Sequence, residues 1–132
     1  MTIQATGTYE IKNWEEETFS EVEGGHKLTR ASVATAFQGD IEGAGTLEYL
    51  LIYREEDCAY IGVERVIGRV GEREGSFVLQ HDGVFAGTTA RSNWSVVPGT
   101  GTGSLQGLTG KGGYNGEHGE SNARFTLEYS FE

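Results

Sequence analysis

Apolar side chains recur at every second residue of this chain, and that period is the feature that most constrains its fold. The clearest case is the final segment, where polar residues separate Phe125, Leu127, Tyr129 and Phe131. Residues 3–11 alternate in the same way. Because successive side chains of a β-strand point to opposite faces, the pattern predicts strands with one buried face. No amphipathic helical pattern of about ten residues is visible, which excludes a βαβ fold.

The same reasoning predicts about eight strands joined by short turns. Besides the two terminal strands, we expect strands at 28–38, 41–53, 59–70, 76–81, within 84–97 and around 110–114. We interpret the acidic stretch 14–25 as an exposed connection that holds at most a short helical turn. Asp82-Gly83 is a hairpin signal, residues 104–108 suggest one helical turn capped by Ser104, and residues 116–120 suggest a loop.

Glycine is abundant and proline is nearly absent, with 21 and 1 residues of 132. Glycines inside strands help a sheet to bend, and positions 43, 45, 62, 68 and 87 fit that need. An even-numbered meander can close on itself and so remove its exposed edges. The sequence therefore predicts an all-β fold, a closed antiparallel eight-stranded meander barrel, as a single domain over residues 1–132.

The charge of the chain limits its partners. Asp and Glu total 20 against 10 Lys and Arg, a formal charge of −10. Such a surface repels phosphate backbones and anionic lipids, so we expect neither nucleic acid nor a membrane as partner. In the simplest interpretation, the acidic surface keeps the protein soluble. In the alternative interpretation, it steers a cationic ligand toward the protein. The lone Cys58 and an N-terminus without a basic start or apolar core favour a reducing, cytoplasmic location.

Several separated motifs agree in order and spacing with one known family. They are KLTRAS at 27–32, GDIEG at 39–43, GVER at 62–65, GSFVLQH at 75–81 and WSVVPGTGTG at 94–103. Over about residues 5–132 the chain resembles DUF3224, a bacterial family of unknown function. The resemblance implies a barrel similar to that of allene oxide cyclase, and it implies no activity, because a shared fold is a weak guide to function.

His81 is the histidine of greatest interest. It shares a predicted strand face with Phe77 and Leu79, so we expect it in the barrel lumen as a titratable group in an apolar wall. The alternative is a position at the barrel mouth. His26 and His118 lie far from it in sequence without the short spacings of a zinc site, so we expect no metal and no cofactor.

A buried charge is predicted on the strand 59–70. Tyr60, Glu64 and Val66 share one face, and Arg65 lies on the other, so either Glu64 or Arg65 must be buried unless the outer face is covered. A buried carboxylate needs partners. Glu64, together with Glu42 on the preceding strand, is therefore either a polar anchor in a ligand cavity or part of an ion pair across strands or between subunits.

Other residues carry weaker signals. Trp94 and Tyr129 either pack the core or line an apolar pocket. The glycine-threonine run at 99–103 lacks the ending of a phosphate-binding loop and is expected to turn the chain. Cys58 has no activating neighbour, and nearby acids would raise its pKa. No catalytic residue can be assigned, because no nucleophile motif is present.

Three functions remain open from the sequence. The first is a binding barrel for a small apolar or aromatic ligand, with Glu64, His81, Glu42, Trp94, Tyr129 and Phe77 as candidate contacts. The second is an isomerase or cyclase acting on a hydrophobic substrate in the lumen. The third is a structural module with a filled core. Apolar residues on both strand faces, including Leu50 and Val63, also predict a homo-oligomer.

Overall fold

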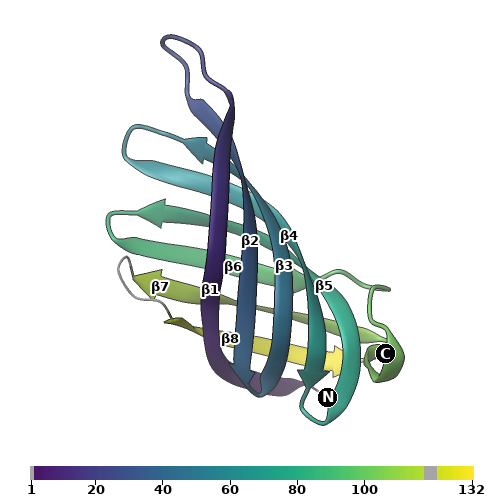
Figure 1. Ribbon diagram of the computed structural model, residues 1–132. Helices are drawn as coiled ribbons and strands as arrows, with labels where there is room; N and C mark the ends of the chain where they lie inside the picture. Colours follow the sequence, from purple (N-terminus) through teal and green to yellow (C-terminus); the bar gives the residue numbers. More distant parts are fainter. Residues whose placement is uncertain (1, 118–121) are drawn as a thin grey trace.

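The computed structural model describes residues 2–117 and 122–132. The chain forms an antiparallel meander whose last strand pairs with its first, so that the sheet closes into a barrel (Figure 1). Its elements are β1 (Ile3–Ser20), β2 (Lys27–Gly39), β3 (Ile41–Tyr53), β4 (Asp57–Val70), β5 (Arg73–Ala86), β6 (Thr89–Val96), the 3-10 turn η1 (Gly103–Leu105), β7 (Leu108–Glu117) and β8 (Asn122–Phe131).

The predicted eight-stranded closed barrel is confirmed. Along β4, for example, burial alternates strictly from Cys58 to Ile67, with Glu64 inward and Arg65 outward. The hairpins β1–β2, β3–β4 and β5–β6 lie at one end of the barrel, while both termini lie at the other (Figure 1). No helix within the described residues is long and apolar enough to cross a membrane.

The expected connection at 14–25 is wrong for most of its length, because β1 continues to Ser20. Here it pairs with β2, with Trp14 opposite Val33 and Glu16 opposite Ala31. The alternation was hidden by a β-bulge, in which Lys12 and Asn13 together oppose one residue of β2. The extra residue moves the inward-facing set from odd to even positions, so a strict period-two reading fails there.

The hairpin predicted at Asp82-Gly83 is also wrong. Both residues lie inside β5, where Gly83 is paired with Tyr60 on one side and Ser92 on the other. The absent side chain serves packing instead of a turn, since a Cβ at Gly83 would come within 2.6 Å of the Tyr60 ring. The turn itself falls at Gly87, whose φ of 61° favours glycine.

The chain after β6 forms an irregular edge beside β5. Thr100 Oγ1 accepts a hydrogen bond from the Val78 amide at 3.1 Å, and Thr102 Oγ1 accepts one from the Ser76 amide at 3.0 Å. The run 99–103 thus turns the chain and ties it to β5. The helical turn predicted at 104–108 begins one residue earlier, at Gly103, and Ser104 lies within it, so Ser104 is not its cap.

The interior has two unlike halves. Toward the termini the lumen is filled by a cluster of large side chains that includes Phe37, Phe77, Trp94, Phe125 and Leu127. Toward the hairpin end a smaller cluster includes Ala31, Val33, Leu47, Tyr49, Leu51, Cys58 and Tyr60. The first cluster makes a solid core, and the second leaves space.

Candidate functional site: a cavity above a buried carboxylate

A cavity of about 640 Å³ occupies the hairpin end of the barrel. Seven of its sixteen described lining residues are aromatic, namely Tyr9, Trp14, Tyr49, Tyr53, Tyr60, Phe85 and Tyr114. Its volume falls in the range of roughly 300–1,000 Å³ that is typical of small-molecule sites. Part of the lumen is therefore available to a ligand.

The cavity exists because small residues and an incomplete seam meet at this end. Ala90, Gly116 and Ala123 contribute little volume to the wall. Among the described residues, the pairing of β1 with β8 ends at Glu10 and Asn122, so the outer part of β1 is bonded to β2 alone. The cavity lining includes Ile11 and Asn122, at the point where β1 departs from β8. The β1–β2 hairpin projects at this end of the barrel (Figure 1).

Glu64 lies inside the barrel next to the cavity and has no solvent exposure. Its Oε1 atom is 2.8 Å from His81 Nε2, and the Tyr9 hydroxyl donates to both carboxylate oxygens at 3.1 and 3.2 Å. The Thr35 hydroxyl donates to Oε2. Four strands thus converge on one carboxylate, and every partner named here is a donor, as an ionised carboxylate requires.

The partners of His81 define its protonation. The Trp94 indole N–H lies 3.1 Å from Nδ1 of His81. An indole nitrogen can only donate, so Nδ1 must accept and cannot carry a proton. The proton of the neutral ring therefore sits on Nε2, from which it is donated to Glu64. The contact between His81 and Glu64 is thus a hydrogen bond that the imidazole N–H donates to the carboxylate.

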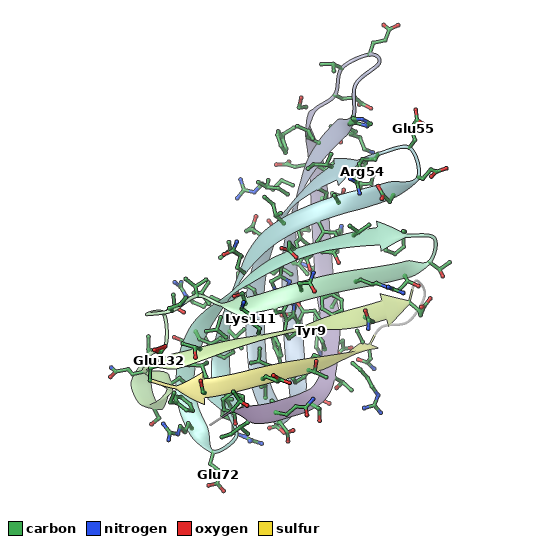
Figure 2. The ribbon with its side chains drawn as sticks, turned by 180° about the vertical axis from the view of Figure 1, so that it is seen from behind. Tyr9, Arg54, Glu55, Glu72, Lys111 and Glu132 are labelled. Atoms are coloured by element: carbon green, nitrogen blue, oxygen red, sulfur yellow. The ribbon has the colours of Figure 1, made fainter. Side chains whose placement is uncertain are left out.

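A chain of hydroxyls connects this network to the cavity. The Tyr49 hydroxyl is 3.3 Å from His81 Nδ1 and 3.2 Å from the Tyr114 hydroxyl. Tyr9, Tyr49 and Tyr114 all line the cavity, and we call these three side chains the floor. Figure 2, a view from behind, shows Tyr9 within the barrel. A bound molecule would meet polar hydroxyls at the floor and rings along the walls.

Burial keeps two of the floor tyrosines, Tyr9 and Tyr49, protonated. It is the main cause that raises the pKa of Tyr9 well above its ordinary value, and the negative charge of Glu64 adds to it. Burial likewise raises the pKa of Tyr49, with a further contribution from Tyr114. These hydroxyls therefore act as hydrogen-bonding groups, because removing their protons is harder than in water.

Two glycines make room for these side chains. A Cβ at Gly45 would lie 2.2 Å from both Glu64 Oε2 and Thr35 Oγ1. A Cβ at Gly62 would lie 2.6 Å from the ring of Tyr49. Positions 45 and 62 were predicted to bend the sheet, and their absent side chains also permit the close approach of the buried network.

Glu16 forms the acidic edge of the cavity on β1. Its oxygens accept hydrogen bonds from Trp14 Nε1 at 2.9 Å, from the Thr29 hydroxyl at 2.6 Å, and from the Tyr53 hydroxyl. Burial alone would raise the pKa of Glu16, but these bonds, with a further contribution from the positive charge of Lys27, outweigh it and hold the pKa below its ordinary value. Burial and the bond to Glu16 raise the pKa of Tyr53 to about 12.

Glu117 of β7 is the second carboxylate of the lining. It accepts hydrogen bonds from the Thr89 hydroxyl at 2.7 Å and the Thr88 hydroxyl at 3.1 Å. Cys58 also lines the cavity, and its pKa is raised by burial first and then by Glu16 and Asp57. The prediction that nearby acids raise this pKa is confirmed in direction.

The six candidate contact residues fall into three locations. Glu64 and His81 lie in the lumen beneath the floor, Phe77, Trp94 and Tyr129 lie in the packed core, and Glu42 lies on the outer surface, where it is ion-paired with Arg69 at 3.1 Å. None of the six lines the cavity. His26 contacts the Tyr53 carbonyl outside the lumen, and His118 lies outside the described residues.

The sequence reasoning missed the residues that do line the cavity. Glu16 stands between Glu15 and Glu17 after the bulge, so nothing in the local pattern distinguishes it as inward-facing. Tyr9 and Tyr49 were assigned to strands without a functional role. The available signal was the density of tyrosines, since a buried tyrosine needs a partner for its hydroxyl.

One protein family and one solved structure are similar to this chain over nearly its whole length. The family described as "Protein of unknown function (DUF3224)" matches residues 5–129. The chain belongs to the DUF3224 family. A crystal structure of a DUF3224 protein of unknown function from Shewanella oneidensis MR-1 is 26% identical, with a TM-score of 0.80 over 100% of this chain and 99% of that one. Among curated proteins, none matches this DUF3224 chain.

Proposed function

We propose that this DUF3224 barrel binds a small, largely apolar ligand with aromatic character in the cavity at its hairpin end. The observation that carries the proposal is the cavity of about 640 Å³, which seven aromatic side chains line. Apolar walls supply affinity by removing ligand surface from water, and a few polar groups supply orientation. Tyr9, Tyr49 and Tyr114 are those polar groups, held in place by Glu64 and His81 from below.

We propose that Glu64 and His81 position the tyrosines of the floor and do not contact the ligand themselves. Both are enclosed, with 0% and 1% exposure. They fix the hydroxyls of the floor, and a preorganised site loses less conformational entropy when a ligand binds. A structural module with a filled lumen would need side chains in the space that this cavity leaves open.

A fluorescent probe tests the proposal. N-phenyl-1-naphthylamine is neutral and apolar, and its emission rises in apolar surroundings. We expect saturable binding to the wild-type protein. Leu51, which is 6% exposed, lines the cavity, so Leu51→Trp should fill the site and weaken binding at least about tenfold, which corresponds to about 1.4 kcal/mol.

Leu50→Trp is the matched control, because Leu50 is the neighbouring residue of β3 and faces outward at 45% exposure. It should bind the probe as the wild type does. Ala90→Leu gives a second obstruction in the cavity should Leu51→Trp unfold, as judged by circular dichroism. Equal probe binding by the wild type, Leu50→Trp and a folded cavity variant would refute the proposal, as would no binding at all.

A further inference from the structure

We infer that the ligand of this cavity is an organic cation, such as a protonated or quaternary amine on an apolar body. The inference rests on the proposed function, since it names the chemical class that the same cavity selects. Three features carry it: the carboxylates of the lining, the buried charge under the floor, and the aromatic walls.

The charged side chains that line the cavity are Glu16 and Glu117, and the described lining contains no lysine, arginine or histidine. Their hydrogen-bond partners are all neutral: Trp14, Tyr53 and the hydroxyls of threonines. Within the described chain, neither carboxylate lies within ion-pair distance of a basic group. The positive charge of Lys27 contributes to the lowered pKa of Glu16 from beyond ion-pair distance. The groups that hold the two carboxylates directly are therefore all neutral.

Glu64 adds a third negative charge from beneath the floor. Its Oε1 and Oε2 atoms accept from Tyr9, Thr35 and His81, and His81 is neutral because its Nδ1 accepts from Trp94. Enclosed charge is weakly screened, because little water surrounds it. The potential in the cavity is thus negative from its edge and from its base, which attracts a cation and repels an anion.

Aromatic rings complete the chemistry. The face of a tyrosine or tryptophan ring attracts a cation, and cages of such rings recognise quaternary ammonium groups. The rings of Trp14, Tyr53 and Tyr114 line the cavity. Lys27 shows the interaction at its border, with Nζ 4.5 Å from the centre of the Tyr53 ring. An ammonium group near Glu16 would meet a carboxylate and ring faces together.

Three probes of similar shape but different charge distinguish the effect of ligand charge on binding from the effect of ligand size. They are trimethyl(3-phenylpropyl)ammonium, its neutral carbon isostere (4,4-dimethylpentyl)benzene, and the anion 4-phenylbutanoate, each titrated against bound N-phenyl-1-naphthylamine. We expect the cation to displace the fluorophore at a concentration about tenfold or more below that of the neutral isostere, and the anion to be weakest. Added salt should weaken the cation alone.

Glu16→Gln and Glu117→Gln should each weaken the cation several-fold relative to the neutral isostere, while Glu48→Gln, on the outer surface, should leave that ratio unchanged. A loss of folded protein would affect the cation and the neutral isostere alike, so it does not change the ratio of their displacement concentrations. Equal displacement by cation and isostere, or preference for the anion, would overturn the inference while leaving a binding cavity in place. Failure of the fluorophore itself to bind would instead overturn the proposed function.

Discussion

Glu64 is the residue whose replacement should affect the folded state most clearly. Its carboxylate accepts hydrogen bonds from Tyr9, Thr35 and His81 in the dry interior. Glu64→Leu leaves these donors buried without an acceptor, at a cost of about 1–3 kcal/mol for each unsatisfied group. We expect the free energy of unfolding in urea to fall by at least about 2 kcal/mol.

Glu64→Gln should cost less than Glu64→Leu, because the amide oxygen still accepts from part of the network. Glu48→Leu is the control on the outer surface, where Glu48 forms an exposed ion pair with Arg30 at 2.9 Å. Its loss should change stability by less than about 1 kcal/mol. A Glu64→Leu protein as stable as the wild type would show that the network is dispensable for folding.

The lowered pKa of Glu16 predicts that the free energy of unfolding depends on pH. Its pKa in the folded protein lies below the ordinary value near 4.5, so the unfolded chain binds a proton more readily than the folded one. The stabilisation is complete above the unfolded pKa and is lost as pH falls through the folded pKa.

The measurement is the free energy of unfolding of the wild type and of Glu16→Gln between neutral and acidic pH. Other carboxylates affect both proteins, so the difference isolates Glu16. That difference should be largest at neutral pH and shrink as the solution is acidified through the carboxylate range. A difference that stays constant with pH would contradict the assignment.

Gly45 lies inside β3 at a point where any side chain would collide with residues of β2 and β4. Gly45→Ala would place a methyl carbon 2.2 Å from Glu64 Oε2 and Thr35 Oγ1. Overpacking of this kind costs about 1–3 kcal/mol, so we expect thermal and urea unfolding to shift accordingly.

Gly116→Ala in β7 is the matched substitution, because the nearest atom that its Cβ would meet among the described residues is 3.4 Å away. It should leave stability unchanged or raise it by less than about 1 kcal/mol. Equal effects of the two alanines would mean that Gly45 serves the backbone and not the space around Glu64.

At the scale of elements, regular strands could be predicted from the sequence, whereas the points where a strand is interrupted or continues through a turn-like sequence could not. The bounds of β3, residues 41–53, were predicted in full, although the apolar run at 49–53 does not alternate in sequence as its burial does in the structure. The course of β1 was missed because the bulge at Lys12 shifts which residues face inward. Asp82-Gly83 satisfies a turn preference locally, but pairing with β4 and β6 on either side holds it in β5.

The whole molecule carries an apolar stripe on its outer surface. Leu50 and Ile52 of β3 and Ile61, Val63 and Ile67 of β4 are 40–63% exposed, and Leu50 is paired with Ile61. The homo-oligomer stays a prediction, and this stripe is the surface on which it depends. We expect light scattering to give a mass above that of the 14.3 kDa chain.

Ile61→Lys with Val63→Lys should reduce that mass to the monomer, because two buried charges would oppose association. Thr46→Lys and Gln80→Lys, on outward positions beside the stripe, control for added charge. A monomeric wild-type protein would refute the oligomer and leave the cavity untouched, since the stripe lies on the opposite face of the sheet from the lumen.

The sequence by itself predicted about eight strands and the burial of a charge on the strand 59–70, at either Glu64 or Arg65, because each follows from a local period or from the parity of one strand. That the meander closes and that Glu64 is the buried charge were both decided by the tertiary structure. The cavity was decided by tertiary structure. Its position depends on where β8 stops pairing with β1 and on which rings from distant strands converge. A period of two specifies which face of a strand is inward, whereas the volume left between inward faces depends on all the strands at once.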